Sequence, residues 1–407
     1  MDSHTHKVSS WIILLLAISC GIIAANIYYA QPLVGLISTE IGLPPEAAGL
    51  IVTLTQIGYG LGLLFIVPLG DLVENRRLVV SIMMVGILAL ASAGIAQSAL
   101  FFLTASIFIG LGSVAVQVLV PYAAHLSPEA NRGHAVGRVM SGLLLGIMLA
   151  RPISSFVTSL WGWRTVFYLS ALLVAALALI LQFALPKRQP VSVKNYGNLL
   201  MSLWSLMINT PILRRRAAYH AGLFGAFSLF WTAVPLLLAS PVFHLSQREI
   251  ALFTLAGVSG AIAAPIAGRL ADRGFVKIAT LCAILAVAAA FLMTFIGQSG
   301  SSLSLTMLVL AAVLLDLGVS ANLVLGQREI FSLGAEIRGR LNGLYLALFF
   351  AGGAIGSALG GWAYAKDGWL LCAWIGFALA VPVLLYFASE WQKSKRVNRL
   401  AISRPIG

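Results

Sequence analysis

The sequence predicts an all-α membrane protein, built from twelve transmembrane helices in two pseudo-symmetric six-helix bundles. The first observation is composition, because 60% of the 407 residues are hydrophobic and only 10% are charged. Soluble domains carry about 25% charged residues to keep their surface solvated. The second observation is that the apolar stretches are continuous rather than alternating, which argues against a transmembrane β-barrel. The third is a set of short motifs that recur about 200 positions apart.

Twelve stretches approach the roughly 20 apolar residues that a helix needs to cross about 30 Å of hydrocarbon. They lie at 11–32, 47–70, 78–97, 99–124, 137–160, 165–186, 218–240, 248–270, 277–297, 303–326, 341–363 and 369–389. We interpret the first as an uncleaved span, because it runs directly into further apolar sequence.

The spans fall into two groups of six, which divide the chain into four parts. We expect an N-terminal bundle at 1–186, a linker at 187–217, a C-terminal bundle at 218–390 and a basic tail at 391–407. Apolar residues at helical spacing from Leu199 to Leu213 predict an amphipathic helix that lies on the membrane surface.

The positive charges predict the orientation, because cytoplasmic loops are enriched in Lys and Arg. Of the 26 basic residues, 22 lie in the segments on the side of the N-terminus, and only Arg164, Arg248 and Lys366 lie in the opposite loops. We therefore expect both termini in the cytoplasm. The same distribution explains the net charge of +13, because the excess of Lys and Arg residues sets the orientation in the membrane. We therefore expect no nucleic-acid partner.

The two halves repeat each other. Arg132-Gly133 recurs as Arg338-Gly339, and Gly162-Trp163 recurs as Gly368-Trp369, both at an offset of 206 residues. Asp71 and Asp272 occupy matching positions after the second and eighth spans. Matches in the same order at nearly one offset indicate a duplicated six-helix unit.

These motifs also carry a family resemblance. Gly268-Arg269-Leu270-Ala271-Asp272-Arg273 after the eighth span, and Gly162-Trp163-Arg164 with Phe167 before the sixth, resemble elements of the major facilitator superfamily. The run from Asn26 to Pro32 resembles a bacterial branch of efflux proteins that exchange drugs or metabolites for protons. The resemblance implies alternating access about a site between the halves, driven by an ion gradient.

Two charged residues lie inside predicted spans, where a charge costs about 2.5–3.5 kcal/mol and usually marks function. Asp316 lies 12 positions from Arg328, which places it about 18 Å from the inner boundary. Arg151 lies at a similar depth. We expect Asp316 to carry protons, because removal from water lets a carboxyl group take up a proton near physiological pH. The alternative is a permanently neutral acid, hydrogen-bonded to a neighbouring helix.

Arg151 has three interpretations. It pairs with Asp316 in one conformation, it binds an anionic group of the substrate, or it reaches backbone carbonyls at the break caused by Pro152. We expect Arg151 and Asp316 to form the proton-coupling pair.

Uncharged polar residues recur at helical spacing and suggest a substrate site. Asn26 and Tyr29 share a face, as do Gln56 with Tyr59 and Asn342 with Tyr345. The resemblance implies that spans 1, 4, 7 and 10 line a cavity. The predicted substrate contacts are Asn26, Tyr29, Gln56, Tyr59, Gln117, Trp231, Asn322, Asn342 and Tyr345. The alternative role for each is hydrogen bonding between helices.

Loop charges suggest a gate. By the resemblance, Asp71 and Asp272 cap helix N-termini of the opposite half and hold the cytoplasmic side shut, with Arg76 and Arg273 in support. A carboxylate at a helix N-terminus contributes about 0.3–1 kcal/mol, enough to bias two nearly balanced states. The alternative is a pair of solvated loop acids.

The sequence therefore predicts a secondary transporter of the bacterial inner membrane that exports a small amphipathic organic compound in exchange for protons. A proton-symport importer is the alternative. An integral membrane enzyme is a third possibility that no catalytic motif supports. We expect a monomer in the lipid bilayer, with no cofactor and no metal.

Overall fold

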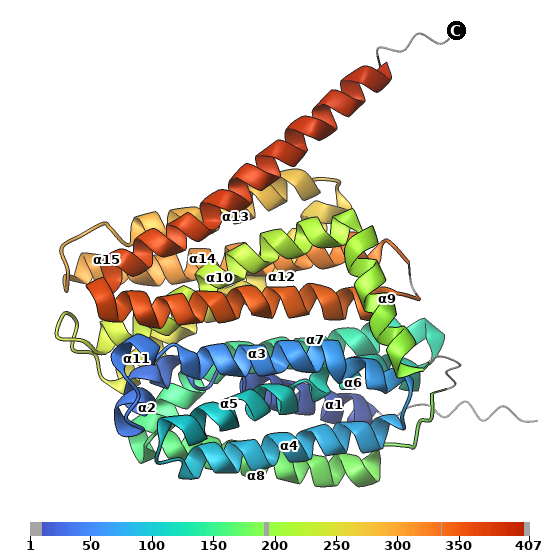
Figure 1. Cartoon of the computed structure of the whole chain (residues 1–407), viewed down its shortest axis with the longest axis horizontal. Helices are drawn as coiled ribbons and strands as arrows, with labels where there is room; N and C mark the ends of the chain where they lie inside the picture. The colour runs from blue at the N-terminus through green and yellow to red at the C-terminus, as the bar shows by residue number, and fades with distance from the viewer. Residues whose placement is uncertain (1–9, 191–194, 335, 403–407) are drawn as a thin grey trace, which may run out of the picture.

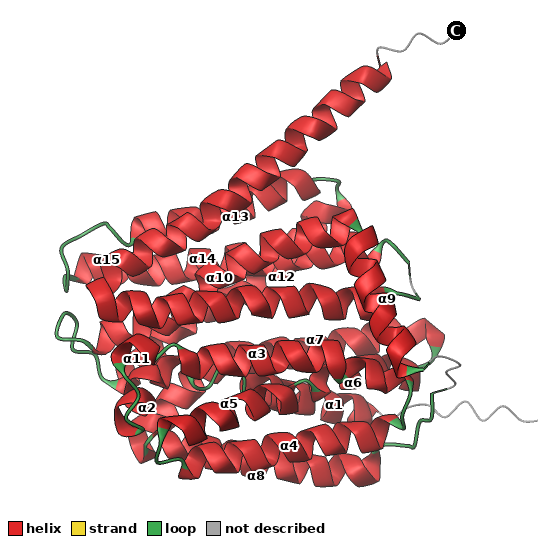
Figure 2. Cartoon of the chain, in the orientation of Figure 1, coloured by secondary structure: helices red, strands yellow, loops and turns green. Residues whose placement is uncertain are grey.

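A computed structural model describes residues 10–190, 195–334 and 336–402. These residues form helices joined by turns and loops, without a strand (Figure 2). Lys7, Lys194 and Arg404, which the orientation argument counts among the inner charges, lie outside the described residues.

Twelve membrane spans follow from the described helices. By length and composition, ten helical stretches could each cross a membrane. One of them, Arg338–Lys393, contains two spans, because Asp367 and Gly368 leave the helical conformation inside it. The apolar helix Ser10–Ala25 is shorter and supplies the first span.

Helices make up most of each half. The N-terminal half contains α1 (Ser10–Ala25), α2 (Val34–Glu40), α3 (Leu50–Phe65), α4 (Asn75–Ile95), α5 (Ala99–Ser113), α6 (Ala115–Leu126), α7 (Arg132–Trp161) and α8 (Trp163–Ala184). The C-terminal half contains α10 (Pro211–Ala239), α11 (Gln247–Thr254), α12 (Gly260–Asp272), α13 (Val276–Met293), α14 (Ser302–Phe331) and α15 (Arg338–Ile402). Between them lies α9 (Tyr196–Asn209).

Figure 1 shows the two halves as adjacent layers of roughly antiparallel helices, with α9 crossing from one to the other at one end. We call this the linker end and the opposite one the distal end. Asp71 and Asp272 lie at the linker end, and the loop between α4 and α5 lies at the distal end.

Three predicted spans are interrupted. The first helix ends at Ala25, and the chain then forms the 3-10 helix η1 (Gln31–Leu33), where Pro32 lacks the N–H that a longer helix would use. The fourth span breaks between α5 and α6, and the eighth contains the 3-10 helix η5 (Leu255–Ser259). Irregular backbone at membrane depth is tolerated only when it is buried in protein or lines a cavity. These breaks therefore indicate the functional interior.

The linker differs from its predicted boundaries. The helix α9 ends at Asn209, four residues before the expected end, because Thr210 precedes a proline and adopts φ −115°, ψ 88°. Pro211 then opens α10, seven residues before the predicted span. Arg214, Arg215 and Arg216 consequently belong to the first turns of a spanning helix rather than to the linker.

Glycines allow two helix pairs to approach closely. In the contact between α1 and α7, a Cβ on Gly146 would lie 2.1 Å from the carbonyl oxygen of Gly21. In the contact between α10 and α15, a Cβ on Gly356 would lie 1.9 Å from the carbonyl oxygen of Gly225. Any side chain at these positions would therefore force the helices apart.

We predict that Gly146→Ala destabilises the protein by about 1–3 kcal/mol, because the methyl group would overlap the backbone of α1. Thermal unfolding in detergent measures the effect. Gly137→Ala is the matched control on α7, since nothing lies within 4 Å of its Cβ position. Equal melting temperatures for the two variants would contradict the close contact.

Candidate functional site

A cavity of about 320 Å³ lies between the two halves. Its walls come from α1, α3, α6 and α7 of the N-terminal half and from α10, η5, α14 and α15 of the C-terminal half. The four spans expected to line a cavity are therefore all present in its wall. Seven Phe and Tyr rings contribute to its apolar surface: Tyr28, Tyr59, Phe224, Phe227, Phe331, Phe349 and Phe350.

The cavity contains one acid and one arginine, contributed by opposite halves. Asp316 on α14 is 5% exposed and Arg151 on α7 is 2% exposed. The indole Nε1 of Trp231 donates to Asp316 Oδ2 at 2.9 Å. Arg151 Nε donates to Gln31 Oε1 at 2.7 Å.

Aromatic rings surround the guanidinium of Arg151. Its Cζ lies 4.3 Å from the ring centroid of Trp231, 5.0 Å from that of Phe227 and 5.4 Å from that of Tyr28. Desolvated cation–π contacts are each worth up to about 2 kcal/mol. They stabilise the buried cation, yet Arg151 Nη2 has no hydrogen-bond partner among the described residues.

Asp316 and Arg151 face each other across Gly257 without forming a salt bridge in this conformation. The position that a Cβ of Gly257 would take lies 3.2 Å from Arg151 Nη1 and 3.4 Å from Asp316 Oδ1. The observed partner of Arg151 is the side chain of Gln31, rather than Asp316 or a carbonyl at Pro152. A side chain at Gly257 would therefore crowd both charged groups.

Four further predicted residues lie at the cavity or at the contact between the halves. Gln117 Nε2 donates to the hydroxyl of Tyr59 at 2.9 Å, and both line the cavity. Asn342 also lines it and accepts from Gln327 at 3.0 Å. Gln56 Nε2 donates to Ser228 Oγ at 2.7 Å, which joins the two halves.

Asn26 and Tyr29 are not among the residues that line the cavity. Asn26 accepts from Ser170 of α8, inside its own half. Tyr29 lines an outer groove between α1 and α7, whereas its neighbour Tyr28 lines the cavity. The reason is that α1 ends at Ala25, so the helical spacing that placed Asn26 and Tyr29 on one face does not apply.

Asn322 and Tyr345 lie behind the cavity wall. Asn322 is 1% exposed, and neither of its side-chain polar atoms has a partner among the described residues. The hydroxyl of Tyr345 is 2.5 Å from Nδ1 of His220. Of these two residues, His220 lines the cavity and Tyr345 does not. Sequence reasoning missed His220 and Gln31, because neither stands out from the polar residues near predicted span ends.

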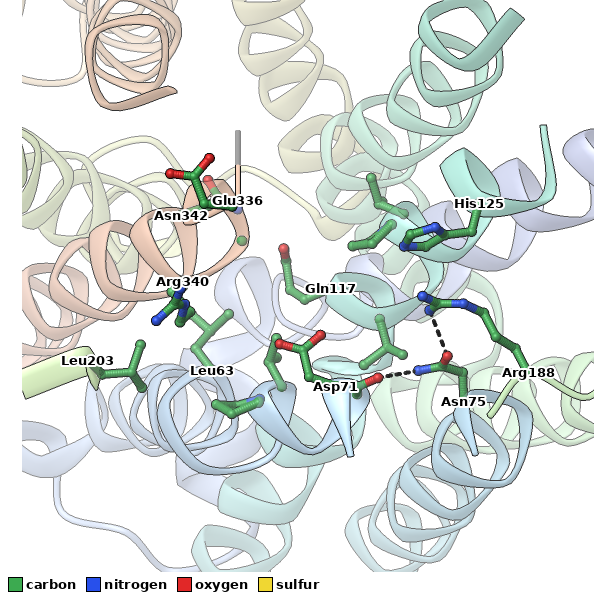
Figure 3. Close-up of a pocket in the computed structure, with 18 residues that line it drawn as sticks. Leu63, Asp71, Asn75, Gln117, His125, Arg188, Leu203, Glu336, Arg340 and Asn342 are labelled. Carbon is green, nitrogen blue, oxygen red and sulfur yellow. Dashed lines mark hydrogen bonds between the residues drawn. The ribbon is translucent and has the colours of Figure 1, made fainter. Parts of the chain in front are cut away.

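A second pocket, of about 250 Å³, lies at the linker end and shares Gln117 and Asn342 with the central cavity. Figure 3 places Asp71 between Arg340 on one side and Asn75 with Arg188 on the other. Asn75 donates to the carbonyl of Gly70 at 2.7 Å and accepts from Arg188 Nη1 at 2.8 Å. Asp71 thus faces the first turn of α15 in the opposite half.

The other residues considered for gating make contacts inside one half. Arg76 Nη1 donates to the carbonyl of Leu185 at 3.2 Å, which fixes the end of α8. Asp272 is the last residue of α12 and pairs with Arg328 of α14, in its own half rather than the opposite one. Arg328, and not Arg273, is therefore its partner. Both side chains of this pair are largely exposed, so it contributes little to stability.

At the distal end the halves are in direct contact. Thr53 Oγ1 on α3 is 2.8 Å from Ser357 Oγ on α15 and donates to the carbonyl of Ala354 at 3.1 Å. A Cβ on Gly49 would lie 2.2 Å from the carbonyl oxygen of Ser357. The cavity therefore reaches toward the linker end, while the distal end is closed.

Comparisons with known proteins agree with this architecture. The family model described as Major Facilitator Superfamily matches residues 15–246 and again 218–401. The uncharacterized transporter YgaY of Escherichia coli O157:H7 is 37% identical over 98% of this chain and 100% of its own length. A probable transporter of Streptomyces coelicolor is 34% identical over 87% of this chain and 82% of its own. The crystal structure of the nucleoside transporter NupG superposes with a TM-score of 0.72 at 15% identity, covering 92% of this chain and 99% of that one.

We predict that Thr53→Val opens the distal end more often, because valine has a similar shape but loses both hydrogen bonds to α15. A loss of about 1–3 kcal/mol for the two hydrogen bonds shifts the balance of states roughly 5- to 150-fold. Spin labels at Ser98 and Ser299, in distal loops of the two halves, measure the separation after the exposed Cys282 is replaced by serine. Thr55→Val is the control, since its hydroxyl bonds only within α3. Identical distance distributions for the two variants would contradict this role.

Proposed function

Because the chain belongs to the Major Facilitator Superfamily, it is a multi-pass membrane transporter and not an enzyme, and we propose that it couples transport of a small amphipathic organic compound to protons. The observation that carries the proposal is Asp316, buried in a cavity between the halves. Among the described residues that line this cavity, it is the only acid.

Asp316 is suited to carry a proton. A carboxyl group in a water-poor cavity beside a positive charge can exist in both protonation states, because burial favours the neutral form and the cation favours the charged one. The cavity also provides amide, hydroxyl and aromatic groups for a substrate, from Gln117, Asn342, Tyr59 and Tyr28. Such a lining fits a small organic molecule with one polar end.

Protonation couples to the movement of the halves through Arg151. Arg151 belongs to the N-terminal half and Asp316 to the C-terminal half, so their attraction acts across the moving interface. For charges about 4–6 Å apart at an effective dielectric constant of about 20, it amounts to roughly 3–4 kcal/mol. Proton binding removes this attraction, and a change of that size shifts a two-state equilibrium strongly.

The charge distribution supports an orientation. The linker end carries the Lys- and Arg-rich segments, so we assign it to the cytoplasm, together with both termini. In this assignment, the contact between the halves at the distal end lies on the side away from the cytoplasm. The relative YnfM of Escherichia coli is described as an inner membrane transport protein, and we propose the same membrane for this chain, as a monomer.

We propose that Asp71 is the gate residue of the linker end. It lies in the pocket that faces the first turn of α15, where a carboxylate interacts favourably with the helix N-terminus. Arg76 supports this region through α8. At the matching position of the C-terminal half, we propose a supporting role for Asp272, Arg273 and Arg328.

Whether proton and substrate cross the membrane in opposite directions or in the same direction distinguishes export by exchange from import by symport. Exchange requires proton and substrate to compete for the site, whereas symport requires both to bind together. Import by symport is the second candidate function, and the observation that favours it is the position of Arg151 beside Asp316.

We predict that Asp316→Asn abolishes proton movement linked to substrate flux, because asparagine cannot release a proton. Proteoliposomes with a pH-sensitive dye inside measure proton movement, and labelled substrate counterflow measures the carrier cycle. Trp231→Phe is the companion variant, since it keeps a ring but loses the hydrogen bond to Asp316. Unchanged coupling in Asp316→Asn would refute the proton-carrier role.

We predict that Asp71→Asn shifts the balance toward the state open at the linker end, because the neutral side chain interacts less with α15. The expected change is about 0.3–1 kcal/mol, or roughly two- to fivefold in population. Distances between spin labels across the linker end measure it. Arg328→Gln, which breaks a pair inside one half, serves as the control. A larger shift in the control than in Asp71→Asn would argue against the gate.

A further inference from the structure

We infer that the transported compound is an organic anion with an apolar or aromatic body, and that it binds together with a proton. This inference rests on the proposed proton-coupled function and specifies its substrate class and the sign of its coupling. It follows from the charge balance of the cavity, the unused donor of Arg151 and the aromatic lining.

The charge balance involves few groups. Among the described residues that line the cavity, the charged or titratable ones are Arg151, Asp316, His220, Tyr28 and Tyr59. His220 lies 11 positions before Trp231 on α10, about 16 Å toward the linker end.

Asp316 meets one cation among the elements packed around it. Arg151 faces it from α7, and the hydroxyl-bearing ring of Tyr28 lies beside that arginine. The neighbour on α10 is Trp231, the neighbour on η5 is Gly257, and α13 contributes apolar side chains such as Val287 near Gly318.

The empty site is neutral only while Asp316 is ionised. When Asp316 takes up a proton, Arg151 becomes a buried cation without a counter-charge. A buried, unpaired charge costs several kcal/mol. An anionic group that enters the cavity removes this cost, because Arg151 lines the cavity and its buried Nη2 lacks a partner among the described residues. The guanidinium fork is suited to bind a carboxylate.

The space for such a group is the part of the cavity that Arg151, Asp316 and Gly257 line together. The Cβ position of Gly257 is 3.1 Å from Trp231, 3.2 Å from Arg151 and 3.4 Å from Asp316, so any side chain at Gly257 would crowd all three. The apolar body would then contact the rings of Phe224, Phe227, Phe349 and Phe350, which line the same cavity. A cationic compound is disfavoured, because Arg151 stands next to Asp316, which is the only acid among the described residues of the lining.

The sign of the coupling follows from linkage. An anion beside Arg151 is repelled by ionised Asp316 and accepted by protonated Asp316. Proton binding therefore strengthens anion binding, and the anion strengthens proton binding by the same factor. Two ligands that favour each other travel together, which is symport. One anion with one proton carries no net charge, so a pH gradient drives the transport and the membrane potential does not.

Binding to the purified full chain tests the substrate class with three probes of similar shape. These are 4-phenylbutyrate, its neutral amide and the cationic 4-phenylbutylamine, and isothermal titration calorimetry measures each. We expect the carboxylate to bind best, and roughly 5- to 100-fold more tightly near pH 6 than near pH 8, because coupling to one proton changes the affinity by at most about tenfold per pH unit. Carboxylates titrate near pH 4, so this probe stays ionised at both values.

Variants identify the groups responsible. We expect Arg151→Gln to lose the preference for the carboxylate and Arg151→Lys to retain part of it. Asp316→Asn imitates the protonated acid, so it should bind the carboxylate tightly at both pH values. Arg138→Gln is the matched control, because Arg138 is exposed on the same helix and lines the outer groove. Thermal unfolding identifies any variant that fails to fold.

Each result bears on the inference. A carboxylate that binds no better than its amide, or that keeps its preference in Arg151→Gln, overturns the substrate class. Weaker carboxylate binding near pH 6 overturns symport. If the amine binds best and loses affinity on acidification, the inference fails while proton coupling survives as cation exchange. Proteoliposome uptake that follows the membrane potential at zero pH gradient overturns electroneutral symport. Uptake without any proton movement instead refutes the proposed function itself.

Discussion

The burial of Arg151 in an apolar helix bundle is the constraint on which the site depends. An arginine at membrane depth costs several kcal/mol unless protein groups replace water around it. Here Gln31 and Tyr28 come from the N-terminal half, whereas Phe227 and Trp231 come from the C-terminal half. Neither half can stabilise the cation alone. The charged centre is therefore complete only while the two halves are closed around it at the distal end.

This arrangement explains why the spans are irregular where they approach the centre. Gln31 belongs to η1 and Gly257 to η5, two 3-10 segments that replace regular helix at membrane depth. A continuous α-helix through residues 11–32 would carry Gln31 about 9 Å beyond the end of α1 along the same axis. The turn after Ala25 instead brings its amide to Arg151. At η5 any side chain at Gly257 would crowd both charged groups.

Much of the fold could be predicted from the sequence, because continuous apolar stretches and the bias of Lys and Arg reflect the membrane directly. Asp316 and Arg151 could be singled out for the same reason, since a charge inside an apolar stretch is conspicuous. Periodicity predicts which residues share a face within a helix, but it does not locate the point where a helix ends. For this reason the periodicity places Asn26 and Tyr29 at the cavity and does not single out Gln31. It also predicts that α10 starts after Arg216, whereas α10 begins at Pro211. His220 illustrates a second limit, because its proximity to Tyr345 depends on how α10 packs against α15.

The position of a charge pair relative to the two halves decides whether it can drive the transport cycle. Arg216 on α10 binds Glu329 on α14 with two hydrogen bonds of 2.7 Å, and Asp272 on α12 pairs with Arg328 on α14. Both pairs lie inside the C-terminal half, so they move as one body and their energy stays constant as the halves rock. They can stabilise that half, but they cannot favour one conformation over another. Arg151 and Asp316 differ because they lie on opposite sides of the interface, so a rocking movement of the halves would change their separation. Of these three charge pairs, only this one can convert a protonation event into a movement of the halves.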